Sequence, residues 1–532
     1  MMAITPLSLR NDYWDTFNIQ EEDLEFLYNH LLELETPQTT QELVQALVIE
    51  LIRQEKGRLT SQQEAQGTIY RPKDHYQLGQ SLSFPSLNWQ EGQITTVRPG
   101  NNPEYPPFEV IQVQFSPEET KEFAAGFTHH ILNKPLAINL DDPLLNLINV
   151  VQEYGKPIAH HLNEMLEANP DLVRIAGRWF PRALLVDVNM GHLNLAEAVL
   201  DMSGGGPLST PAVLEQIELP TDVNAKLTEF SLNLALQEDG RFDEIGPAGE
   251  ILWFLRRLEP DAVQNVPLTL RYSHFDYDQK QVLDMIKQLD AMVVDELEPF
   301  KNTLSKEDEL TFSLIFPHWR AGTIPLTTRI GQFFPTAYES PRVQFTFVDG
   351  NSGEKISGWV VRPFQYVYGL REWYTAQGVF PGSLITVKRG KKPGEVIILA
   401  NKHRPTREWI RTALIGADGG IVFAMLKQNI SCSYDERMAI AIPDLAALDP
   451  LWDSTRSLHN LEQSVLTMLK ELSKLNPQGH VHFQELYTTV NLVRRCPPGL
   501  IFSILGEKPW AHHLGDLYYN LEEISAEGRQ ND

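Results

Sequence analysis

The chain has 532 residues, of which 42% are hydrophobic and 22% charged, and its formal net charge is -25. At about 150 residues per domain, this length predicts three or four domains, and the composition is that of an ordinary globular chain rather than a disordered one. The 70 acidic residues outnumber 45 basic ones and repel nucleic acid at long range, so any such binding must be local and salt-sensitive.

Two cysteines, Cys432 and Cys496, cannot build a disulfide framework, and a free pair is typical of a reducing cytoplasm. The first residues lack the charged start and unbroken apolar core of a signal peptide. No run approaches the ~20 apolar residues that would span a bilayer. We therefore expect a cytoplasmic protein with no membrane partner, and the oligomeric state stays open.

Residues 1–66 are predicted to form a helical N-terminal domain, because two apolar stripes at helical spacing fill residues 20–57. Thr40 is placed to cap the second helix. Over residues 67–116 the period changes to that of strands, as in the alternating run Phe108–Phe115. A small β-barrel is predicted there.

Three later segments share an apolar strand, a turn with glycine and a second strand with an aromatic residue. These aromatic residues are Trp179, Trp253 and Tyr518, and each hairpin follows a predicted helix. Helices followed by a short hairpin are the order of a winged helix, a helix-turn-helix variant. We therefore predict a helical segment with a wing-like hairpin over 117–186 and a winged helix over 187–262.

The C-terminal winged helix, predicted for residues 453–532, is the fullest of the three. Two striped helices are followed by Pro497-Pro498, which can start a third helix. His482 falls where the second helix begins and is expected to cap it or to pack. Residues 263–310 are predicted to be a helical connector, and residues 416–452 an α/β extension.

The run His480–Leu486 and the closing Leu514–Tyr518 resemble the HARE-type helix-turn-helix domain and the delta subunit of bacterial RNA polymerase. The module at 187–262 is similar, and there Thr210 is expected to cap a helix that has Pro211 at its first position. Such domains act in transcription or accompany DNA-modifying enzymes, and the delta subunit is itself strongly acidic. The resemblance implies a role in transcription or DNA processing.

The third helix of the module at 187–262 tests this implication. It is expected to expose a nearly neutral face, whereas a helix in the major groove normally brings basic and amide side chains. Packing against protein is therefore an open alternative. The residues expected on the exposed face are Lys226, Glu229, Asn233 and Gln237.

Residues 311–415 are predicted to form a second β-barrel with a basic hairpin. The run Gly382–Pro393 parallels Gly92–Pro103 at matched spacing, through shared architecture or through convergence on one hairpin. The segments Phe345–Asp349 and Val379–Ser383 resemble the plant B-three pseudobarrel and its relatives in some restriction enzymes. In that family, loops on one side of the barrel grip the major groove of DNA.

A basic island runs from Lys388 to Arg411, where eight Lys or Arg face only two Glu, a local net charge of +6. Cations of this kind neutralise phosphates and release counterions, so the island is the predicted nucleic-acid-binding segment. The alternative is a solvated hairpin tip that offsets acidic neighbours. The candidate residues are Lys388, Arg389, Lys391, Lys392, Lys402, Arg404, Arg407 and Arg411.

No phosphate-binding loop, dinucleotide fingerprint, serine elbow or zinc-binding helix occurs in the sequence. His274, Asp276 and Asp278 would share a face of an extended chain, but they precede a helix, whose start favours acidic residues. Adjacent histidines point apart on a helix or strand, which argues against metal binding. Such pairs are His129-His130, His160-His161 and His512-His513. No catalytic residue, metal or cofactor is predicted.

The sequence thus predicts a multidomain α+β protein with several winged-helix modules and two small β-barrels. It is expected to be non-enzymatic and to bind nucleic acid, in the first place duplex DNA, through the second barrel. The first alternative is an acidic interaction scaffold with a basic protein partner, associated with RNA polymerase or a DNA-processing complex. The second alternative is an enzyme whose site is assembled across domains.

Overall fold

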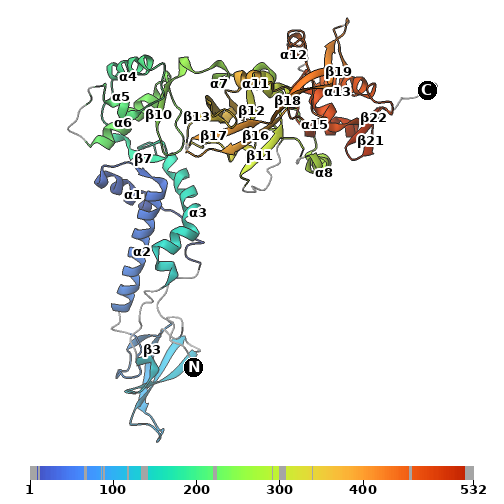
Figure 1. Cartoon of the computed structure of the whole chain (residues 1–532). Coiled ribbons are helices and arrows are strands. Elements are labelled where there is room, and N and C mark those ends of the chain that lie inside the picture. Colours follow the sequence, from blue (N-terminus) through green and yellow to red (C-terminus); the bar gives the residue numbers. More distant parts are fainter. Residues whose placement is uncertain are drawn as a thin grey trace, which may run out of the picture. The chain divides into compact units, whose positions relative to one another are not determined.

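The computed structural model shows an α+β chain of several modules (Figure 1). It divides into two compact units, one made of residues 1–186 and 221–230, the other of residues 187–220 and 231–532. No helix in the described part of the chain is both long and apolar enough to cross a membrane. The structure describes residues 9, 12–64, 69–84, 87, 90–116, 119–133, 142–217, 219, 224–289, 292–298, 307–337, 339–392, 394–417, 419–453 and 458–521.

The first module is assembled from two distant parts of the sequence. Strand β1 pairs with β7, so the helices of the predicted domain 1–66 and the hairpin of the predicted segment 117–186 form one module. Its three-stranded sheet has the order β1-β7-β6. Its elements are α1 (Glu21–Leu34), β1 (Gln38–Thr39), α2 (Thr40–Glu64), α3 (Leu147–Glu167), β6 (Leu172–Ile175) and β7 (Arg178–Pro181).

A four-stranded antiparallel sheet lies in the sequence between α2 and α3. Its order, β2-β3-β4-β5, follows the chain, and alternate residues such as Ile111 and Val113 are buried in its core. The last strand lies beyond the predicted end at residue 116. The strands are β2 (Ser81–Phe84), β3 (Gln90–Pro99), β4 (Glu109–Ser116) and β5 (Glu119–Ala125), followed by the short turns η3 (Ile131–Asn133) and η4 (Pro143–Leu145).

The second and third modules repeat the element order of the first. In each, the first short strand pairs with the last, giving the orders β8-β10-β9 and β20-β22-β21. The second contains α4 (Met190–Met202), β8 (Leu208–Ser209), α5 (Thr210–Leu214), α6 (Ala225–Glu238), β9 (Phe242–Glu244) and β10 (Leu252–Leu255). The third contains α13 (Leu458–Ser473), β20 (Val481–His482), α14 (Phe483–Val490), α15 (Pro498–Glu507), β21 (Ala511–Gly515) and β22 (Tyr518–Leu521).

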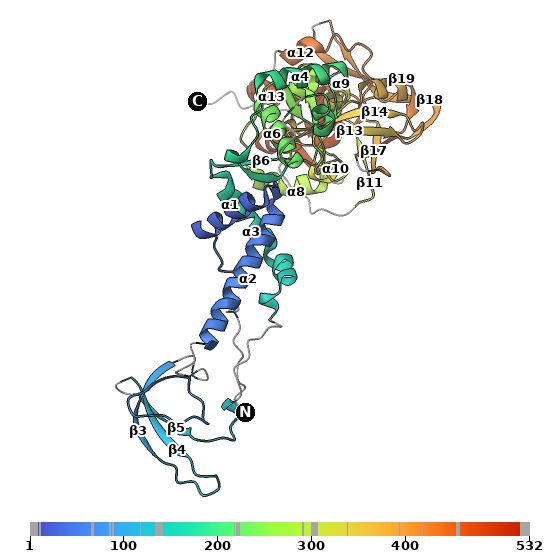
Figure 2. The same cartoon turned by 90° about the vertical axis from the view of Figure 1, so that its left-hand side faces the viewer.

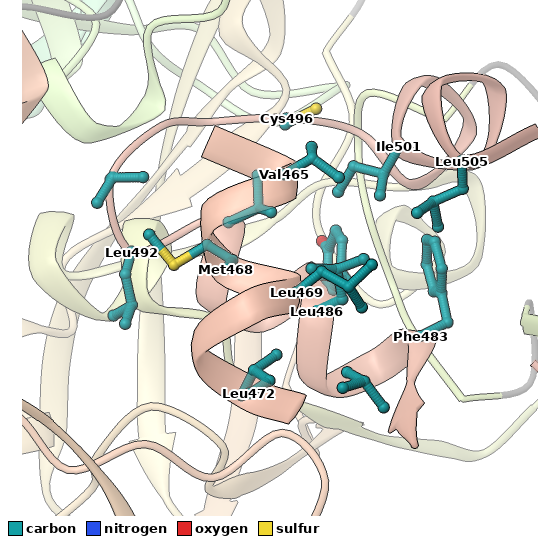
Figure 3. Close-up of a cluster of buried hydrophobic side chains, with 14 of the residues drawn as sticks. Val465, Met468, Leu469, Leu472, Phe483, Leu486, Leu492, Cys496, Ile501 and Leu505 are labelled. Atoms are coloured by element: carbon teal, nitrogen blue, oxygen red, sulfur yellow. The ribbon is translucent and has the colours of Figure 1, made fainter. Parts of the chain in front are cut away.

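Apolar stripes at helical spacing build the core of the third module. Val465 and Leu469 of α13 meet Leu486 of α14 and Ile501 of α15 in one buried cluster (Figure 3). The predicted cap is confirmed, because the His482 ring accepts a hydrogen bond from the backbone N–H of Gln484 at 3.2 Å.

The caps predicted at Thr40 and Thr210 are wrong by one residue. Each is the first residue of its helix, and the residue before it, Thr39 or Ser209, occupies the capping position. The two threonines are instead buried in matching networks. Each hydroxyl donates to an asparagine of the third helix and accepts from the indole N–H of a tryptophan in the last strand, Trp179 in the first module and Trp253 in the second.

A seven-stranded sheet lies between the second and third modules in the sequence. Its order is β11-β16-β17-β13-β14-β15-β12, and β13 and β17 are its one parallel pair among the described residues. Alternate residues of β13, such as Phe345 and Phe347, are buried. The strands are β11 (Glu309–Ser313), β12 (Thr323–Pro325), β13 (Arg342–Asp349), β14 (Lys355–Val361), β15 (Tyr366–Tyr368), β16 (Leu384–Arg389) and β17 (Glu395–Ala400).

Short helices and turns lie between the modules and strands along the chain. The helices are α7 (Asp261–Gln264), α8 (Gln279–Leu289), α9 (Phe316–Ala321), α10 (Thr328–Gly331), α11 (Arg371–Gln377) and α12 (Asp449–Asp453). The turns are η5 (Arg182–Leu184), η6 (Arg256–Leu258), η7 (Leu268–Leu270) and η8 (Arg362–Phe364). The two stretches with matched spacing, Gly92–Pro103 and Gly382–Pro393, both belong to hairpins, β3–β4 and β16–β17. Only β17 also pairs with a parallel strand, so the likeness between the two stretches is local.

The next two strands, β18 (Lys402–Ile415) and β19 (Ile421–Cys432), form a separate two-stranded ribbon and run side by side in Figure 2. The predicted domain boundary between residues 415 and 416 therefore falls at the turn of this hairpin. The basic island is divided between the seven-stranded sheet and the ribbon.

Candidate nucleic-acid interface

The predicted basic island is two clusters rather than one surface. Lys388, Arg389, Lys391 and Lys392 lie at the turn between β16 and β17 and are called the turn cluster here. Lys402 follows the opposite end of β17, whose six residues span about 20 Å. The two groups of cations therefore lie at opposite ends of one strand.

Two cations of the turn cluster already interact with neighbouring groups of the protein. Lys388 forms an ion pair with Glu309, its cross-strand partner on β11. Arg389 donates a hydrogen bond to the carbonyl of Gln332 at 3.2 Å. Arg389, Lys391 and Lys392 are all exposed and make no ion pair within the described residues. This resembles the solvated hairpin tip that was the alternative interpretation.

The ribbon carries the second group, Lys402, Arg404 and Arg407, which with Lys427 we call the ribbon cluster. Lys402 pairs with Cys432 and Thr406 with Ile430, so the intervening residues form a bulge on β18. The three β18 side chains are exposed, and they form no ion pair within the described part of the chain.

A tryptophan that sequence reasoning missed lies among these cations. Trp409 is 60% exposed, and the Lys427 ammonium lies 5.2 Å from its ring centroid. Trp409 and Lys427 are cross-strand partners, and Arg407 with Asn429 is the next pair on the same face. The signal in the sequence was the period of two in a basic strand, which places Arg407 and Trp409 on one face.

Arg411 is not a surface cation, which corrects its inclusion among the candidates. It is 7% exposed and forms an ion pair with Glu485 of α14, and it also donates to the carbonyl of Arg437 at 3.0 Å. Burial lowers the pKa of its guanidinium, and Glu485 opposes that shift. Arg411 therefore ties the ribbon to the third module.

A cavity of about 560 Å³ opens beside Trp409, between the ribbon and the third module. Its polar lining includes Arg437, Asn476 and His480. Arg437 approaches the ring nitrogen of His482 at 3.2 Å. Burial and the Arg437 charge lower the pKa of His482 to about 4, so that ring is neutral near pH 7.

None of the three third helices offers a basic face. Seven of the ten residues of α15 are buried. Seven of the fourteen residues of α6 are also buried, including Asn233, whose predicted exposure is wrong because it bonds Thr210 and Trp253. The exposed side of α3 is acidic, with Glu153, Lys156, His160, Glu164 and Glu167. These helices lack the cations that groove binding requires.

Of the three residues considered for catalysis, His274 lines a cavity of about 450 Å³, and Asp276 and Asp278 do not. No three His, Cys, Asp or Glu side chains of the described residues are arranged to hold a metal ion. His274 lies 3.4 Å from the exposed Asp276. Asp278, the residue before α8, accepts a hydrogen bond from the backbone N–H of Lys280 in the first turn of that helix. His160 and His161 each lie 3.6 Å from Glu164.

A buried ionic network joins the segment before β11 to the third module. Arg495 contacts Asp295 at 2.5 Å and Glu296 at 2.9 Å, and His318 contacts Glu296 at 2.9 Å. Burial opposes ionisation of Glu296, but the charges of Arg495 and His318 keep its pKa well below the usual range. A cavity of about 450 Å³ adjoins this network. The carboxylates of Asp295 and Glu296 are thus paired within the protein.

Comparisons with protein-family models, with curated proteins and with solved structures each found no match to this chain.

Proposed function

We propose that this chain is a non-enzymatic nucleic-acid-binding protein of the cytoplasm, associated with transcription or DNA processing. In this proposal the three repeated modules are winged helices, and the seven-stranded sheet is the pseudobarrel that the sequence resembles. DNA is bound through the ribbon that follows the sheet.

The repeated element order supports the winged-helix part of the proposal. Each module has a helix, a short strand, two further helices and a hairpin, and the short strand pairs with the second strand of the hairpin. None of the third helices has a basic exposed face, so in this proposal these modules serve as packing units. Nucleic-acid contact is therefore assigned to another surface.

The observation that carries the proposal is the ribbon cluster. Arg404 and Arg407 are exposed, form no ion pair within the described residues and lie near an exposed Trp409. Cations held this way can neutralise phosphates without first giving up a protein partner. The turn cluster contributes less, because Lys388 is already paired with Glu309.

A salt titration tests this assignment. Binding of the full chain to a fluorescein-labelled 20-base-pair DNA and to the matching single strand is measured by anisotropy at increasing salt. Arg404→Glu with Arg407→Glu should lower the log–log salt slope by about two, close to one for each phosphate that the variant no longer neutralises. Lys391→Glu with Lys392→Glu is the comparison variant and should change the slope less. Absence of binding to both probes at low salt would reject the proposal.

An acidic interaction scaffold is the second candidate, favoured by the buried third helices and the net charge of -25. Its partner would be a basic protein rather than a nucleic acid. A labelled polylysine probe, titrated after nuclease treatment, should then bind the chain, and Arg404→Glu with Arg407→Glu should not weaken that binding. Weaker polylysine binding by the ribbon variant would contradict this candidate.

A further inference from the structure

The ribbon distinguishes between two forms of nucleic acid. A duplex hides the faces of its bases in the stack and presents phosphates and base edges, whereas a single strand also offers base faces to aromatic side chains. A surface built for a single strand therefore combines cations with an exposed aromatic ring. The ribbon has that combination at Trp409.

The ring of Trp409 contacts the side chain of Lys427 and is otherwise largely exposed. Lys427 lies 5.2 Å from the ring centroid, and the side chain is still 60% exposed. Nothing in the described part of the chain forms an aromatic pair with this ring. An exposed tryptophan held on a strand, with an ammonium beside it, is a ready stacking surface.

The cavity beside Trp409 is large enough for a base. Its volume is about 560 Å³, and the polar side chains of Arg437, Asn476 and His480 line its walls, the first two already hydrogen-bonded within the protein. Arg411 lines it as well, and its buried Nε atom has no hydrogen-bond partner among the described residues. The edge of a base stacked on Trp409 would face polar groups with which it could form hydrogen bonds.

The cations of the ribbon are placed for the adjoining phosphates. Arg407 is two residues from Trp409 on the same strand face, and Lys427 is directly opposite Trp409 on β19. Arg404 extends this set into the bulge. Acidic residues also line the cavity, namely Glu408, Glu436 and Glu485, and the last is paired with Arg411. The phosphates are therefore expected along the ribbon cluster and outside the cavity.

We propose that the ribbon binds a single-stranded nucleic acid, with an unpaired base stacked on Trp409 beside the cavity and the neighbouring phosphates on Arg404, Arg407 and Lys427. This inference rests on the proposed function and narrows its ligand from nucleic acid in general to an unpaired strand. The duplex becomes the weaker ligand.

The test uses the full chain and three labelled probes, a 20-mer of dT, a 20-mer of rU and a 20-base-pair DNA. The dT or rU 20-mer should bind more tightly than the duplex. Trp409→Ala should weaken single-strand binding about ten-fold, within the range seen when a stacking aromatic is removed. Trp409→Phe should retain most of the affinity, because phenylalanine still stacks. Duplex binding should stay the same in both variants.

Trp409 is exposed, so both variants are expected to fold, and an unchanged thermal midpoint confirms this. Equal single-strand affinity of Trp409→Ala and the parent chain would overturn the stacking site and leave the proposed function standing. Tighter binding of the duplex would do the same. Failure of all three probes to bind at low salt would overturn both proposals. A preference between dT and rU would identify the strand as DNA or RNA.

Discussion

The first two modules and the third solve the same packing problem differently. In the second module, Trp253 donates to Thr210 at 3.2 Å and to Asn233 at 3.0 Å, and Thr210 donates to Asn233 at 2.5 Å. In the first, Trp179 donates to Thr40 at 3.1 Å, and Thr40 donates to Asn163 at 2.7 Å. A polar triad thus joins the second helix, the third helix and the last strand.

The third module keeps the strand register and replaces the triad with rings. Val481 pairs with Tyr519 as Leu208 pairs with Trp253 in the second module. Phe483 starts the second helix, and its ring stacks on Phe502 of the third helix at a centroid distance of 3.6 Å. The rings of Phe483, Phe502 and Tyr519 are all buried.

The difference shows that strand pairing does not depend on one kind of core. A buried polar triad needs every donor and acceptor satisfied, while stacked rings need only shape and burial. Exchanging single members between the two arrangements should therefore be costly, and exchanging the whole set should cost less.

The largest effect is expected for Phe502→Asn in the third module. The variant loses a buried ring and buries an amide among apolar groups, which together cost about 5 kcal/mol of unfolding free energy. Hydrogen exchange of peptides covering α14 to β22 would report this local loss. Phe502→Leu, which keeps an apolar side chain, should cost far less.

A triple variant sharpens the same point. Phe483→Thr, Phe502→Asn and Tyr519→Trp together rebuild the polar triad in the third module and should recover part of the protection that Phe502→Asn alone removes. If the triple variant is less protected than the single one, the two arrangements are not interchangeable and the comparison fails.

A smaller effect is expected for Asn233→Leu in the second module. The substitution removes the acceptor of the Thr210 hydroxyl and one of the two acceptors of the Trp253 indole, at a cost of about 1–3 kcal/mol. Asn163→Leu in the first module should cost less, because Asn163 is only half-buried and water can replace the amide. Hydrogen exchange on peptides of the two modules measures both losses, and equal losses would contradict this account.

The smallest effect, when it is taken per pH unit, concerns the contact between the second module and the seven-stranded sheet. Arg342 of β13 forms an ion pair with Asp243 of β9 and lies 3.9 Å from Glu259. Burial, together with the charge of Asp243, raises the pKa of Glu259 to about 8, and burial raises the pKa of Glu244 to about 7. Arg342 and Arg256 oppose the shift of Glu259.

The direction in which stability changes with pH follows from the glutamate carboxyl of the unfolded chain, whose pKa is about 4.3. Between that pH and about 8, native Glu259 keeps a proton that the unfolded chain has lost, so stability falls as pH rises, by at most about 1.4 kcal/mol per pH unit. Glu259→Gln should flatten this slope in thermal midpoints taken at pH 5.5, 6.5 and 7.5, with a remainder from Glu244. The exposed Glu250→Gln is the control, and parallel curves for Glu259→Gln and the parent would refute the assignment.

Local patterns in the sequence predicted much of the secondary structure. The alternation in β4 and β13, the hairpin with Trp253 and the cap at His482 all depend on residues close in sequence. The site was predicted less well. Arg411 is buried, and a strand divides the basic island. A count of nearby charges in the sequence could predict neither feature.

The sequence by itself determined that this chain alternates helical and extended segments, that its charge is strongly acidic with one basic stretch, and that short helices precede hairpins. Tertiary structure decided that β1 pairs with β7 across an inserted sheet, that Asn233 is buried and that Trp409 shares its face with Lys427. The reason is physical: periodicity and capping act between neighbours, whereas pairing and burial depend on residues brought together from distant parts of the chain.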